Sequence, residues 1–153
     1  MGIMDKLKSA ANFVTGGGAE INISMPEEVE MGTPFQINIK CLAKNDINPK
    51  RVYVKLQSVE NVEVEDRDYD EDGDTDYEYI HRQSVIFDEE YDIEGELSLS
   101  EGEEKTWDKE VVVPDEAQCT YEGVHAKHQW RLQVGLDVPG NDPDSGWVYF
   151  DAY

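Results

Sequence analysis

Beyond residue 18, apolar and polar residues alternate along short runs of the sequence. Ile21 and Ile23 are separated by Asn22, and the same alternation recurs over 35–42 and 52–57. A period of two residues places the apolar side chains on one face of a β-strand, so each run predicts a strand with one buried face. We expect strands at 21–24, 35–42, 52–64, 79–87, 93–99, 105–113, 128–138 and 147–150. Turn-forming residues separate them, and this pattern predicts an all-β, immunoglobulin-like sandwich of two antiparallel sheets.

Residues 1–18 follow a different period. Their apolar residues recur at spacings of three and four, which is typical of one face of an α-helix. These residues are Ile3, Met4, Leu7, Ala10, Ala11 and Val14. The glycine triplet 16–18 follows, and glycine both ends helices and loosens the backbone. We therefore expect a short N-terminal amphipathic helix and a glycine hinge over 1–18, and a single sandwich domain over 19–153.

The sequence contains 35 Asp and Glu residues against 13 Lys and Arg residues, which gives a formal net charge of −22. Phosphate binding needs clustered basic residues, and the sequence has no such cluster, so we expect no nucleic-acid partner. The same charge repels anionic lipids and disfavours a membrane partner. The acidic residues are explained either by cations or basic partners that they bind, or by solubility in a salty cytoplasm.

Cys41 and Cys119 are the only cysteines, and each lies in or beside an apolar, strand-like run. So sparse a pair does not form the disulfide framework of a secreted domain, so both are predicted to be buried free thiols. The chain lacks an apolar segment of the ~18 residues that span a bilayer, and its start lacks the pattern of a secretory signal. These features predict a cytoplasmic protein.

One acidic segment has the spacing of a calcium loop. Asp68, Asp70 and Asp72 followed by Gly73 match the D-x-D-x-D-G opening, in which alternate carboxylates bind the cation and glycine permits a tight turn. The candidate calcium ligands are Asp68, Asp70, Asp72, Asp74 and Asp76. However, Tyr79 occupies the place where such a loop needs a bidentate Glu, and strands replace the flanking helices. The alternative is a solvated hairpin tip whose charges block edge pairing.

Other groups of reactive side chains fit a site less well. The segment 137–144 contains four side chains that could bind a cation, but its prolines and glycine predict a turn. The four are Asp137, Asn141, Asp142 and Asp144. His125 and His128 would point to opposite faces of a strand and could not share a zinc ion. The sequence suggests no third group that would orient the Cys119 thiol and a base for nucleophilic catalysis. We expect no catalytic residues, no enzyme activity and no cofactor, with calcium as the one alternative.

The second half of the chain resembles the amino-terminal domain of arrestins. In that family a glycine-containing turn leads to a strand that ends in proline, a Tyr-x-Gly step follows, and a long strand that begins with an aromatic residue crosses the sandwich. The segments that carry the resemblance are 99–103, Trp107–Pro114, Tyr121–Gly123 and Trp130–Asp137. The sequence Gly135–Val138, followed by 141–144, resembles more specifically the bacterial sporulation-control proteins, which are also arrestin-like.

This resemblance implies an arrestin-type sandwich that acts as a scaffold or adaptor, with no catalytic residues to inherit. Members of the family usually have two sandwiches in tandem, whereas one is expected here, and the acidic insertion is unusual. The receptor-tail binding and clathrin recognition of eukaryotic arrestins are therefore not carried over to this chain.

These patterns together predict a non-catalytic intracellular binding or scaffold module, with a regulatory role implied by the resemblance. Its partner would be another protein or a second copy of the chain, bound through the N-terminal helix or a sheet edge. The helix residues expected to make this contact are Ile3, Met4, Leu7 and Val14. The alternative, from a different class, is a calcium-responsive structural or assembly protein that binds the ion through the Asp68–Asp76 loop.

Overall fold

A computed structural model describes residues 7–10, 18–69, 73 and 75–153 of the chain. Ten strands form in this part of the chain. They are β1 (Leu7–Ala10), β2 (Ala19–Pro26), β3 (Glu28–Val29), β4 (Phe35–Ala43), β5 (Val52–Tyr69), β6 (Thr75–Glu94), β7 (Glu104–Val111), β8 (Tyr121–Glu122), β9 (Ala126–Leu136) and β10 (Val148–Ala152). The described residues include no helix, and so none that is long and apolar enough to cross a membrane.

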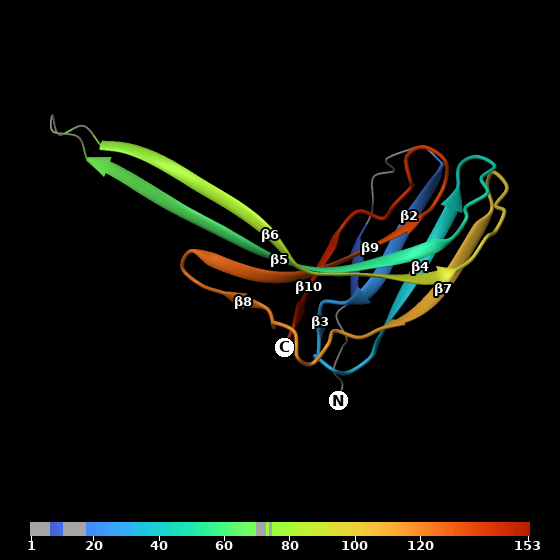
Figure 1. Ribbon diagram of the computed structural model, residues 1–153. Coiled ribbons are helices and arrows are strands. Elements are labelled where there is room, and N and C mark those ends of the chain that lie inside the picture. Colours follow the sequence, from blue (N-terminus) through green and yellow to red (C-terminus); the bar gives the residue numbers. More distant parts are fainter. Residues whose placement is uncertain (1–6, 11–17, 70–72, 74) are drawn as a thin grey trace.

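The strands form two sheets that pack into a sandwich (Figure 1). One sheet contains four antiparallel strands in the order β1-β2-β4-β7. The other contains six strands, in the order β3-β10-β9-β5-β6, with β8 paired to β9. Its pairings are antiparallel except for the one between β3 and β10. The predicted all-β fold of two sheets is therefore confirmed, and the parallel pairing of β3 with β10 departs from the two antiparallel sheets that were expected.

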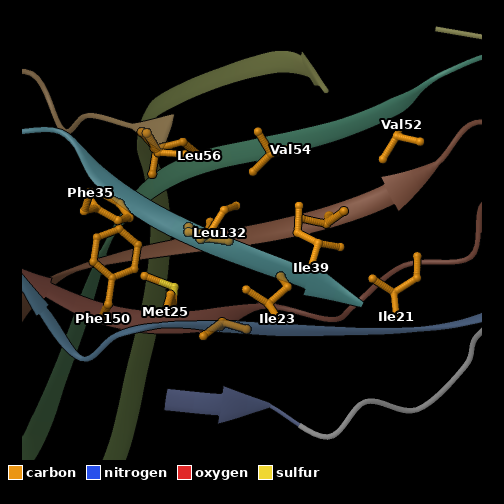
Figure 2. Packing of buried hydrophobic residues seen from close by; sticks show 14 of the residues in the cluster. Ile21, Ile23, Met25, Phe35, Ile39, Val52, Val54, Leu56, Leu132 and Phe150 are labelled. Carbon is orange, nitrogen blue, oxygen red and sulfur yellow. The ribbon is translucent and has the colours of Figure 1, made fainter. Parts of the chain in front are cut away.

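The core lies between the two sheets and uses the alternating positions that the sequence indicates. Buried residues occupy every second position along β2 and β4, and along most of β9. Side chains from both sheets, among them Ile39 of β4 and Leu132 of β9, meet in one cluster (Figure 2). Burial of one such side chain contributes about 1.5–3 kcal/mol, so this cluster is the main source of stability.

β6 is longer than the sequence indicates. It continues through the acidic residues that separate the strands predicted at 79–87 and 93–99. Arg51, which precedes β5, forms ion pairs of 2.8 Å with Glu90 and 2.9 Å with Asp92. These contacts reduce the repulsion between neighbouring carboxylates, and pairing with β5 continues through them with two register shifts. The strand predicted at 93–99 is wrong beyond the end of β6, where the chain forms only an isolated bridge.

The helix predicted at the N-terminus is wrong for the part of it that the structure describes. Leu7–Ala10 form β1, which pairs antiparallel with β2 and completes the four-stranded sheet. The backbone groups along the edge of β2 offer hydrogen bonds to an extended segment, and this pairing outweighs the weak helical preference of a short sequence. The rest of the predicted helix and most of its hinge, residues 1–6 and 11–17, lie outside the described residues.

β5 and β6 extend away from the sandwich as a two-stranded arm (Figure 1). β5 pairs with β9 only as far as Val62, whereas it pairs with β6 as far as Tyr69. The backbone N–H of Glu63 donates to the carbonyl oxygen of His125 at 2.8 Å, at the base of the arm. The arm, defined here as residues 63–69 and 75–80, contains the acidic hairpin that the sequence predicts.

Candidate functional site

β6 lies at the end of the six-stranded sheet and, among the described residues, pairs with β5 alone. Antiparallel pairs alternate between hydrogen-bonded pairs and pairs whose backbone groups point away from each other. Because Glu63 directs its N–H toward His125, its register partner His81 directs its own backbone groups away from β5. The β6 residues with this outward orientation are Tyr79, His81, Gln83 and Val85. β6 thus presents backbone donors and acceptors along its outer edge.

A side-chain hydrogen bond supports this orientation. The carbonyl oxygen of His81 accepts a hydrogen bond from the guanidinium of Arg82 at 3.1 Å. A carbonyl group that pointed toward β5 would accept from the ladder, whereas this one accepts from an exposed side chain on its own strand. An exposed arginine can leave such a contact readily, so the His81 carbonyl is available to an incoming strand.

The segment 79–87, called the β6 edge below, differs in composition from the rest of β6. It contains no Asp, Glu or Pro, although the chain carries a net charge of −22. Three of its large apolar side chains are exposed, with exposed fractions of 69% for Tyr79, 49% for Val85 and 55% for Ile86. Two features here protect sheet edges in other proteins, a register shift opposite Ser58 and the charged side chain of Arg82.

The other end strands of the described sheets are protected. β7 carries Lys, Asp or Glu at five of its eight positions, and charged side chains on an edge discourage pairing with another chain. β1 has four residues and β3 has two, which is too short for extensive strand addition. The β6 edge therefore stands out among the described end strands as a long edge whose one charged residue is Arg82.

A groove of about 480 Å³ lies beside the β6 edge, between the base of the arm and the hairpin that joins β8 to β9. Its residues Lys127 and Gln129 alternate along β9 with the buried His128 and Trp130, so the groove lies on the sheet face turned away from the core. Its lining residues are Asn61, Glu63, His81, Gln83, Glu122, Gly123, Val124, His125, Ala126, Lys127, Gln129 and Tyr149. Amide and imidazole groups predominate, and they can both donate and accept hydrogen bonds.

Side-chain hydrogen bonds organise the sheet face around this groove. Gln83 Nε2 donates to Asn61 Oδ1 at 2.9 Å across β5 and β6. Farther along the sheet, Arg131 Nη2 donates to Gln57 Oε1 at 2.7 Å. The Arg131 guanidinium also lies over the Trp147 ring, 4.1 Å from its centroid. The first of these contacts joins two residues that line the groove, and the other two engage Arg131 beside it.

The structure does not place a thiol beside an imidazole base. His128 is buried, and its Nδ1 lies 2.9 Å from the backbone carbonyl oxygen of Cys119 rather than from the thiol. The His128 ring stacks on Tyr121. Both cysteines are free, but only Cys41 is fully buried, so the prediction that both are buried is wrong for the half-buried Cys119. Burial raises the pKa of the Cys41 thiol to about 11 and keeps it protonated near neutral pH.

The histidines do not form a metal site among the described residues. His125 is exposed and lines the groove, whereas His128 is buried on the opposite face of the sheet. His81 lines the same groove as His125. Within the described ranges, no group of three or more His, Cys, Asp and Glu residues could hold a metal ion.

The predicted calcium ligands are only partly described. Asp68 and Asp76 are register partners across the arm, so the pattern does bring these two aspartates opposite each other. Asp70, Asp72 and Asp74 lie outside the described residues. The calcium site thus stays a prediction.

The residues expected to bind a partner through the N-terminal helix are placed differently. Leu7 belongs to β1, where it is the register partner of Pro26, so it contributes to the four-stranded sheet. Ile3, Met4 and Val14 lie outside the described residues. Binding through these three residues stays a prediction, and Leu7 cannot contribute to it as part of a helix.

The segment 137–144 forms the predicted turn, and its carboxylates support that turn. Asp142 Oδ1 accepts the backbone N–H of Val138 at 3.1 Å, and Asp142 Oδ2 accepts the hydroxyl of Tyr53 at 2.8 Å. Asp144 Oδ1 accepts the backbone N–H of Gly146 at 2.8 Å. Each of these oxygens has a structural partner, so the arrangement favours the turn over a cation site.

Neither the β6 edge nor the groove is among the sites predicted from the sequence. One signal was visible, because the run 79–87 lacks acidic residues although acidic residues lie on both sides of it. The groove has no comparable signal, since its residues come from β5, β6, β9 and the hairpin before β9, which are far apart in the sequence.

No family model and no curated protein matches this sequence. The fold matches 115 chains of solved structures. One of them is the crystal structure of Spo0M, a sporulation control protein from Bacillus subtilis, with a TM-score of 0.61 and 14% sequence identity. The match covers 89% of this chain and 49% of Spo0M, so the chain spans about half the length of that protein. The chain therefore has the arrestin-like fold of the sporulation-control proteins.

Proposed function

We propose that the protein is a non-catalytic, regulatory binding module that captures an extended segment of a partner protein along the β6 edge. The observation that carries this proposal is the edge itself, where outward backbone groups coincide with exposed apolar side chains and no acidic residue. In strand addition, backbone hydrogen bonds provide affinity and alternate side chains provide specificity. The regulatory part rests on the fold shared with Spo0M, which is a sporulation control protein.

The groove supports the same function. Alternate side chains of an added strand point to the face on which His81 and Gln83 line the groove. Polar partner side chains opposite His81 and Gln83 would find donors and acceptors there, and apolar ones opposite Tyr79 and Val85 would cover these two exposed side chains on the same face. Because the Gln83 and Asn61 side chains of the groove are already joined by a hydrogen bond, these two need little further ordering on binding.

A proline at position 83 tests the proposal. The N–H of Gln83 points away from β5, so Gln83→Pro removes a donor of the edge without removing a bond of the ladder. Gln83→Thr is the matched control, since it also loses the contact to Asn61 but keeps the backbone N–H. The probe is a fluorescent peptide with an alternating Val-Thr centre and glutamine ends, and the readout is its anisotropy.

We expect the wild type and Gln83→Thr to bind this peptide with similar dissociation constants. Gln83→Pro should bind at least about tenfold more weakly, because it loses a hydrogen bond and clashes with the added strand. Circular dichroism should show that the variant keeps its fold. Equal affinity of folded Gln83→Pro and wild type would place the binding site elsewhere.

A further inference from the structure

The β6 edge lies between two acidic flanks. Asp76 and Glu78 precede it in the sequence, and the exposed residues Asp88, Glu89 and Glu90 follow it. Within the edge, Arg82 is the one charged residue. The charge along β6 therefore runs from acidic to nearly neutral and back to acidic.

The flanks are far enough apart to act on different parts of a partner. The edge has nine residues, which at about 3.3 Å per residue span roughly 30 Å. This length exceeds the Debye length of about 8–10 Å near physiological salt, so each acidic flank interacts only with the partner residues nearest to it. Residues directly opposite each other in an antiparallel pair attract when their charges are opposite and repel when they are alike.

Resting on the proposed function of this edge, we infer that its partner is an extended segment with Lys or Arg at both ends of an apolar, β-branched centre. The centre would match the nine residues of the β6 edge and cover Tyr79, Val85 and Ile86. The basic ends would lie opposite Glu78 on one side and Asp88 on the other.

A second copy of the chain fits this edge poorly. Antiparallel pairing of two β6 edges about Gln83 would place Glu78 of each copy opposite Asp88 of the other. Each chain also carries a net charge of −22, which adds long-range repulsion between copies. Charge complementarity therefore selects a basic segment over self-pairing.

The experiment compares peptides that share one Val-Thr centre and end in lysine, glutamine or glutamate. A lysine-ended peptide with a Gly-Ser centre of equal length controls for non-specific attraction to an acidic protein. Dissociation constants are measured by anisotropy for the wild type and Gln83→Pro, at about 50 mM and about 1 M NaCl, where the Debye length falls to about 3 Å. Glu78→Gln and Asp88→Asn remove one flank charge each.

We expect the lysine-ended peptide to bind about tenfold more tightly than the glutamine-ended one at low salt, and the glutamate-ended one to bind most weakly. The difference should disappear at high salt. Glu78→Gln and Asp88→Asn should each reduce the lysine preference about twofold to threefold, because each removes one exposed ion pair. Gln83→Pro should weaken every peptide with the Val-Thr centre.

The other outcomes separate this inference from the proposed function. Equal affinity for all three ends, with binding still lost in Gln83→Pro, overturns the inference and leaves strand addition standing. Failure of every peptide to bind the wild type overturns both. Equal binding of the Gly-Ser control, or of the lysine-ended peptide to Gln83→Pro, shows non-specific attraction and overturns the inference. A concentration-dependent dimer that Gln83→Pro abolishes would identify a second copy as the occupant and also overturn it.

Discussion

Replacing Gly135 by alanine is expected to destabilise the sandwich, because the ring of Tyr53 occupies the space of the new methyl group. The two residues are register partners on β9 and β5. A Cβ atom at Gly135 would lie 2.4 Å from the Tyr53 hydroxyl oxygen and 2.5 Å from the ring carbon that carries it. Heavy atoms in favourable contact are about 3.5–4.0 Å apart, so the ring must move.

The magnitude follows from the contacts that the Tyr53 ring would lose. Tyr53 is 5% exposed, its hydroxyl donates to Asp142 at 2.8 Å, and the Arg51 guanidinium lies 4.7 Å from its ring centroid. Loss of a hydrogen bond to a charged group costs about 1.5–3 kcal/mol, and overpacking of a core costs about 1–3 kcal/mol. When the ring moves, the overpacking is partly relieved but the hydrogen bond to Asp142 is lost, so the two costs do not simply add. We therefore expect Gly135→Ala to lower the free energy of unfolding by about 2–4 kcal/mol.

Urea unfolding followed by tryptophan fluorescence measures this change. Gly95→Ala is the matched control, because its new Cβ would meet no atom within 4 Å, and we expect a change within about 0.5 kcal/mol. Tyr53→Phe removes the hydroxyl oxygen that lies nearest the new methyl group. The double variant should therefore be more stable than the sum of the two single changes indicates, by at least about 0.5 kcal/mol. A Gly135→Ala variant as stable as the wild type, or strict additivity, would refute this reasoning.

Three further predictions concern single groups. Glu94 accepts a hydrogen bond from the Trp107 indole, and this bond lowers the pKa of the Glu94 carboxyl group. Glu94→Gln should therefore lower the free energy of unfolding near neutral pH. The variant should differ less from the wild type below about pH 4, because the stabilisation is lost as pH falls through the folded pKa. A difference in urea unfolding that is constant with pH would contradict this. Cys119 should react with a thiol reagent in the native protein and Cys41 only after unfolding, and equal rates would show that Cys41 is accessible. Millimolar Ca²⁺ should raise the melting temperature no more than Mg²⁺ at the same ionic strength, whereas a calcium-specific rise that Asp68→Asn abolishes would favour the calcium-responsive alternative.

The sheets could be predicted from the sequence because burial of one strand face is a local property. Ile21 and Ile23, like Ile37 and Ile39, alternate with polar residues, and all four are at most 1% exposed. The strand conformation of Leu7–Ala10 could not be predicted in the same way. The spacing of this segment fits a helix, but the open edge of β2 provides hydrogen bonds that a local pattern does not reveal.

The candidate site was accessible to sequence reasoning only in part. The absence of acid from 79–87 can be read directly, but its meaning depends on the position of β6 at the end of a sheet. Sheet order follows from pairings between distant strands, such as β5 with β9, and no single run specifies them. The continuation of β6 through its acidic residues likewise depends on Arg51, which lies on a different segment of the chain.

Amide hydrogen exchange at the β6 edge, measured by NMR, tests the central claim most directly. The N–H groups of Arg82 and Ser84 point toward β5, whereas those of His81 and Gln83 point outward. In the free protein, the amides of His81 and Gln83 should exchange rapidly and those of Arg82 and Ser84 slowly. Saturation with the lysine-ended peptide should slow exchange at His81 and Gln83 to the rates of their neighbours. Exchange at these two amides that is already slow in the free protein, or that stays fast in the complex, would contradict strand addition at β6.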